Sequence, residues 1–134
     1  MIADSDLNLP EVVAEVTAAF ETYESKLRSN DVAALNDFFL PGARTVRYGV
    51  ADAQYGDVAL HAWRRSAPPV HPGRRIMRSV VFGLGRDSAS VAVEFADPGS
   101  SRIGRQTQHW VRSERGWKIA LAHVSLAGPD LAAD

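Results

Sequence analysis

Four segments in the second half of the chain, each rich in β-branched and aromatic residues, constrain the fold more than any other feature. They span residues 76–83, 88–96, 102–112 and 117–126. Turn-forming sequences separate them, namely Gly85-Arg86-Asp87, Asp97-Pro98-Gly99-Ser100 and Ser113-Glu114-Arg115-Gly116. Short apolar segments with such boundaries are typical of strands joined by hairpins. The second half of the chain is therefore predicted to form an antiparallel meander of four strands.

The first half of the chain predicts helices. A helix is expected over residues 9–29, because large side chains recur at spacings of three and four: Val13, Val16, Phe20, Tyr23 and Leu27. Asn8 and Glu11 resemble a capping box at its start. Asp31 can cap a second, shorter helix, which Pro41-Gly42 would end.

One strand and a third helix are expected before the meander. In residues 43–50, apolar side chains alternate with others, so Arg47 faces away from Val46 and Tyr48. Tyr55-Gly56-Asp57 reads as a turn leading into a helix over residues 58–65. The segment 66–75 is rich in proline and is predicted to be a loop.

These elements, in a chain of 134 residues of which 46% are hydrophobic, predict a single α+β domain. We expect a curved antiparallel sheet wrapped around the N-terminal helices. A sheet bent around a long helix leaves a conical cavity, which is a natural pocket for a small molecule. The domain is expected to span residues 9–127, with flexible termini at 1–8 and 128–134.

Composition and motifs exclude several classes of protein. The chain has no cysteine, which removes disulfides and thiolate chemistry. A formal net charge of -1 gives no general reason to bind nucleic acid. No apolar stretch reaches the roughly 18 residues of a membrane span, and no signal peptide is visible, so a cytoplasmic location is expected. The four histidines lack metal-ligand spacing, so we expect neither a metal nor a cofactor.

Tyr23 and Arg47 are the first candidates for a functional site. Tyr23 lies on the helical stripe, where it either packs in the core or donates a hydrogen bond to a developing oxyanion. Arg47 is either solvent-facing or salt-bridged, or it faces the interior and binds an anion. A buried Arg47 without an acidic protein partner would indicate an anionic ligand, because an unpaired buried charge is costly.

The last two predicted strands offer a polar pocket wall. Gln106, Gln108 and Trp110 share one face of segment 102–112, which forms either a pocket wall or an exposed face at an oligomer interface. His123 and Ser125 share one face of segment 117–126. His123 titrates near neutral pH and could be a base or a hydrogen-bond donor to the substrate; its alternative is a core position.

Two further charged features have simpler interpretations. Arg74, Arg75 and Arg78 form a local basic cluster, interpreted as a solvated face, with steering of an anion at the pocket rim as the alternative. Glu94 is the only candidate inside a strand for the carboxylate base of a ketosteroid-type isomerase. Its position in the strand alternation sets it opposite the apolar face, which disfavours an isomerase.

Three strand segments carry distinctive residues: Arg44–Val50 followed by Tyr55-Gly56, then Gly104–Arg112, and finally Gly116–Ile119 with Ala122–Leu126. Together they resemble the AtzH-like and HpxZ-like family of the SnoaL-like superfamily. The resemblance extends from about residue 13 to residue 126. It implies the nuclear-transport-factor-2-like cone fold and a homodimer or homotetramer built on the sheet.

The resemblance also implies an activity. Members of this family serve nitrogen catabolism, beside amidase-type enzymes in s-triazine or oxalurate degradation. The activity associated with AtzH is amidohydrolysis of a dicarboxylated urea to allophanate, in effect the loss of one carboxyl group. The chain would thus be a cofactor-independent hydrolase acting on the C–N bond of a small anionic substrate, with Tyr23 and Arg47 tied to the chemistry. Residues 62–65 and the loop 68–72 depart from the family pattern.

A non-catalytic alternative remains open at this point. The same fold can serve as a small-molecule-binding or accessory module that partners an amidase-type enzyme. A closed cavity containing Tyr23 and Arg47 would favour catalysis, whereas a flat apolar patch outside the dimer contact would favour partner binding.

Overall fold

Six strands form one sheet in the order β2-β1-β6-β5-β4-β3 in the computed structural model, which describes residues 1–128. The antiparallel meander is confirmed and consists of β3 (Arg75–Gly83), β4 (Ser88–Ala96), β5 (Ile103–Ser113) and β6 (Gly116–Ala127). The predicted α+β class with a sheet curved over N-terminal helices is therefore correct.

The edge of the sheet beside β6 differs from the prediction. The expected strand over residues 43–50 shortens to β1 (Val46–Tyr48), which runs parallel to β6. A second short strand, β2 (Ala53–Tyr55), pairs with β1 and was not predicted. The backbone N–H of Gly49 donates to the carbonyl of Asp52 and closes a tight hairpin, which leaves few residues for either strand.

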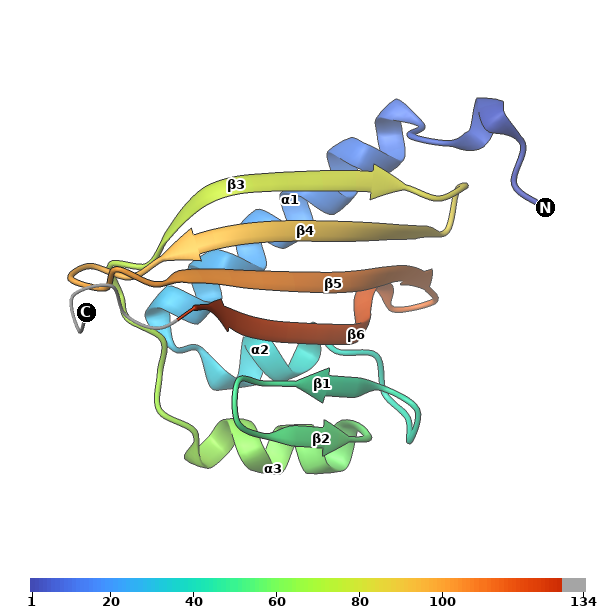
Figure 1. Ribbon diagram of the computed structural model, residues 1–134. Coiled ribbons are helices and arrows are strands. Elements are labelled where there is room, and N and C mark those ends of the chain that lie inside the picture. Colours follow the sequence, from blue (N-terminus) through green and yellow to red (C-terminus); the bar gives the residue numbers. More distant parts are fainter. Residues whose placement is uncertain (129–134) are drawn as a thin grey trace.

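Three helices lie on one side of this sheet. Helix α1 (Pro10–Ser29) passes behind the strands of the meander (Figure 1). Its buried stripe is confirmed, with Val12 rather than Val13 as the first member. Helix α2 (Val32–Asp37) is capped as predicted, because Asp31 Oδ1 accepts from the N–H of Ala34 at 3.1 Å. Helix α3 (Asp57–Ser66) packs against β1 and β2.

The chain before α1 is joined to the sheet. The predicted capping box is wrong, because the helix begins after Leu9 without a side-chain cap. Asn8 instead accepts from the N–H of Gly83 through Oδ1 at 2.9 Å, and Leu7 bridges to Leu84. A short 3-10 helix (η1, Asp4–Asp6) precedes these contacts, so the end of the predicted flexible segment 1–8 is held against the turn after β3. The predicted tail 128–134 lies, apart from Gly128, outside the described residues.

A β-bulge changes which side chains of β6 face the helices. The pairing of β5 with β6 shifts between His109 and Trp110, whose partners are Leu121 and Ile119. Ala120 is the extra residue, and the alternation reverses after it, so that Ile119 and Ala122 are both buried. None of the helices within residues 1–128 is both long and apolar enough to cross a membrane.

Candidate functional site

Tyr23 is held inside the domain by an aromatic cluster. Its side chain is 2% exposed, and its ring meets those of Phe38, Phe39 and Trp110 edge-on, with centroids 5.5, 6.2 and 6.5 Å away. No hydrogen bond joins its hydroxyl to another group in residues 1–128, although the side chain lines a cavity. Burial raises the pKa of Tyr23, while Arg64 and Arg47 oppose that rise. The phenol is therefore neutral at physiological pH and can donate a hydrogen bond.

Arg47 projects from β1 and lines the same cavity. Its side chain is 12% exposed, and its guanidinium carbon lies 3.8 Å from the ring centroid of Trp63. Nη1 donates to Asp52 Oδ1 at 2.9 Å and to Gln54 Oε1 at 3.0 Å. Arg47 thus faces the interior but has an acidic partner, so it does not meet the predicted criterion for an unpaired ligand-binding arginine.

The ion pair lies directly against Gly49. A Cβ on Gly49 would overlap the carboxylate of Asp52 and approach Arg47 Nη1 to 2.8 Å. Desolvation lowers the pKa of Arg47, and nearby Arg64 lowers it further. Both effects disfavour the charged form, so a second anion near Arg47 would be stabilising.

A buried ion pair, which the sequence analysis missed, brings Arg74 into the lining of the cavity. Arg74 donates to Glu24 through Nε at 3.1 Å and Nη2 at 2.8 Å, and Nη2 also donates to Gln106 Oε1 at 3.0 Å. Arg74 is 6% exposed and lies over the ring of Phe95, so its predicted place on a solvated face is wrong. Arg75 and Arg78 are exposed, as expected. The sequence does contain a sign that Glu24 is buried. Glu24 follows Val16 and Phe20 at spacings of four, which places it on the buried helical stripe.

Arg64 is the third arginine of the site. It is 7% exposed and comes four residues after the buried Leu60, on the inner face of α3. Its guanidinium carbon lies 4.6 Å from the ring centroid of Trp63. Within residues 1–128 the guanidinium makes no ion pair or hydrogen bond, and its Nε is buried without a partner. Arg64 therefore meets the criterion that was set for Arg47.

These groups surround a cavity of about 70 Å³. Its lining combines the phenol, three arginines and an amide with apolar side chains: Tyr23, Arg47, Arg64, Arg74, Gln106, Leu27, Val70 and Val124. Glu24 and Asp52 neutralise two of the three guanidinium groups, which leaves one positive charge without a counterion among the described residues. This uncompensated charge suits the cavity to a small anion. Residues 1–128 contain no cluster of three or more His, Cys, Asp or Glu side chains that could hold a metal ion.

The predicted pocket wall on β5 is only partly correct. Gln106, Gln108 and Trp110 share the buried face of β5, and Gln106 lines the cavity. Trp110 Nε1 donates to Gln108 Oε1 at 2.9 Å, and both side chains lie deeper in the core. Trp110 therefore packs against the ring of Tyr23 and does not line the cavity.

His123 and Ser125 are not in this cavity, which corrects the prediction. Both are exposed on the outer face of the sheet, because the bulge at Ala120 reverses the alternation of β6. His123 packs there against the ring of Tyr48. Val124, rather than its neighbours, points to the cavity.

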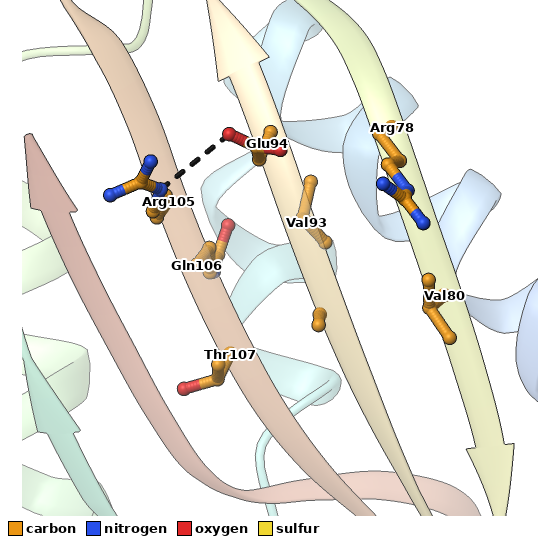
Figure 2. Close-up of a pocket in the computed structure, with 8 residues that line it drawn as sticks. Arg78, Val80, Val93, Glu94, Arg105, Gln106 and Thr107 are labelled. Atoms are coloured by element: carbon orange, nitrogen blue, oxygen red, sulfur yellow. Dashed lines mark ion pairs between the residues drawn. The ribbon is translucent and has the colours of Figure 1, made fainter. Parts of the chain in front are cut away.

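The outer face of the sheet carries two shallow hollows of about 260 and 310 Å³. Figure 2 shows the first of them across β3, β4 and β5, with an ion pair between Glu94 and Arg105. Glu94 lies on this face, as its predicted position in the strand requires, and is remote from Tyr23. Apolar side chains are exposed around the hollows, among them Val80, Phe82 and Leu121.

Comparisons with known proteins agree with this architecture. The chain is 41% identical to a protein of unknown function of the DUF3225 family from Pectobacterium atrosepticum, with a TM-score of 0.92 over 96% of this chain and 100% of that one. It is 46% identical to a cystatin-like fold protein from Burkholderia xenovorans, with a TM-score of 0.87 over 92% and 98%. An NTF2-like protein of unknown function from Pseudomonas putida shares the fold at 15% identity, with a TM-score of 0.71 over 93% and 92%.

A comparison with curated proteins finds no match. The AtzH-like family model matches residues 5–130, almost the whole chain. The resemblance drawn from the three strand segments is thereby confirmed, and the chain belongs to the AtzH-like family.

Proposed function

We propose that this protein is a cofactor-independent amidohydrolase or decarboxylase that acts on a small carboxylated urea or a related diacid. The observation that carries the proposal is a neutral, buried phenol beside a cavity that retains one uncompensated positive charge. Such a cavity favours an anion, and the phenol offers a proton to a group bound next to it. Membership of the AtzH-like family is consistent with this chemistry.

The reaction would proceed on a carbamate-type carboxyl group attached to nitrogen. An arginine of the cavity would hold the carboxylate that does not react, and the amide of Gln106 would orient the urea carbonyl. Tyr23 would protonate the nitrogen, the C–N bonding electrons would pass to that nitrogen, and the carboxyl group would leave as carbon dioxide. Water would then return the proton to the phenolate.

The test is turnover of freshly prepared 1,3-dicarboxyurea, with allophanate and released carbon dioxide quantified. We expect Tyr23→Phe and Arg47→Gln to lower the rate by about a hundredfold or more, as removal of a general acid or an anion-stabilising group does. Tyr55→Phe and Arg44→Gln are the matched controls, because both side chains are exposed, and they should retain the native rate. Turnover no faster than the spontaneous reaction would exclude this substrate.

The catalytic proposal is preferred to the accessory-module alternative on one observation. Tyr23 and Arg47 line the same cavity, an arrangement that supports catalysis. The exposed apolar side chains of Val80, Phe82 and Leu121 lie on the outer face of the sheet, where we propose that a second copy of the chain binds.

A further inference from the structure

Arg64 presents a charge that the protein itself does not balance. It is 7% exposed, and its Nε has no hydrogen-bond partner in residues 1–128. Burying a guanidinium without a counterion is strongly unfavourable. An anion bound from outside the chain would supply the missing charge.

The surroundings of Arg64 place it within the cavity beside Tyr23. Both Arg64 and Arg47 line that cavity, and their guanidinium carbons lie 4.6 and 3.8 Å from the same Trp63 centroid. One small molecule can therefore touch both groups. The two other arginines already have carboxylate partners, Asp52 for Arg47 and Glu24 for Arg74.

We propose that Arg64 is a substrate-binding residue that holds a carboxylate of the substrate, and that it, more than Arg47, makes the site selective for an anion. This inference rests on the proposed function and assigns that site a residue beyond Tyr23 and Arg47. A guanidinium binds a carboxylate through two parallel hydrogen bonds, and its unused donors here allow that geometry.

The neighbouring Arg65 supplies a matched control. It lies on the same helix and carries the same charge, but its side chain is exposed. Arg64→Gln and Arg65→Gln therefore change the net charge equally. Only the first removes a cation from the cavity.

The experiment is a titration of the full chain with malonate, followed through the indole N–H signal of Trp63 in NMR spectra. Neutral malonamide serves as the uncharged probe. We expect saturable malonate binding by the native protein, a dissociation constant at least tenfold higher for Arg64→Gln, and a change below twofold for Arg65→Gln. Arg64→Lys retains the charge but not the planar guanidinium group, so its dissociation constant for malonate should lie between those of Arg64→Gln and Arg65→Gln.

Thermal unfolding separates a binding role from a structural one. Because Arg64 is unpaired, Arg64→Gln should unfold at the same temperature as the native protein or higher. Equal malonate affinity in Arg64→Gln and Arg65→Gln would overturn the inference while leaving the proposed function standing. If malonate causes no saturable change in the Trp63 signal of the native protein, or if malonamide binds equally well, both the inference and the proposed anion site would be contradicted.

Discussion

At the scale of single residues, the protonation state of Tyr23 determines what the site can do. Burial raises its pKa above the ordinary 10.0, although Arg64 and Arg47 pull it down. A phenol in this state donates a hydrogen bond or a proton, and it is a poor base near neutral pH. The raised pKa thus keeps the phenol protonated near neutral pH, which the proposed role as a proton donor requires.

The pH dependence of Tyr23 can be measured directly. The difference spectrum between the native protein and Tyr23→Phe isolates the phenolate absorbance of Tyr23. We expect this absorbance to appear above pH 10.0. Because the folded pKa lies above the unfolded value, the stability due to the protonated phenol is present below pH 10.0 and is lost as the pH rises through the folded pKa. A transition below pH 10.0 in that difference spectrum would mean that the arginines outweigh burial.

At the scale of elements, the Glu24–Arg74 pair ties α1 to the start of β3 and, through Gln106, to β5. Glu24→Gln leaves Arg74 buried without a counterion. We expect a loss of about 3–5 kcal/mol in the free energy of unfolding, measured by urea denaturation. Glu21→Gln, an exposed change of the same charge on the same helix, should stay within about 0.5 kcal/mol of the native value. Equal stabilities of the two variants would show that the pair is dispensable.

The elements also show what could be predicted from the sequence. The stripe of α1 and the four meander strands follow from local periodicity, which survives folding because one face of each element is buried. The inward placement of Gln106 follows in the same way. His123 and Ser125 were misplaced because a bulge at Ala120 depends on pairing between strands, which no local pattern encodes. Arg64 was assigned no role. Arg74 was placed mainly on a solvated face, because its burial depends on a partner distant in sequence, Glu24.

At the scale of the whole molecule, the helices cover one face of the sheet and leave the other uncovered (Figure 1). That outer face carries Val80, Phe82 and Leu121 at 47, 43 and 48% exposure. Arg78, Glu94 and Arg105 line one hollow in it and bring both signs of charge to the same surface. A surface with both signs can pair with its own copy about a two-fold axis. Exposed apolar side chains gathered on one face are typical of surfaces that associate.

We therefore expect the protein to form a homodimer or homotetramer through this face. Light scattering after size exclusion should give a mass of two or four chains of 14.6 kDa. Leu121→Asp places a charge in the second hollow and should reduce the mass, because an unpaired charge is costly to bury in an interface. Val58→Asp is the control, since Val58 is 79% exposed on α3, away from the sheet face, and its assembly should be unchanged. A native mass of one chain, or equal masses for the two variants, would contradict assembly through the sheet.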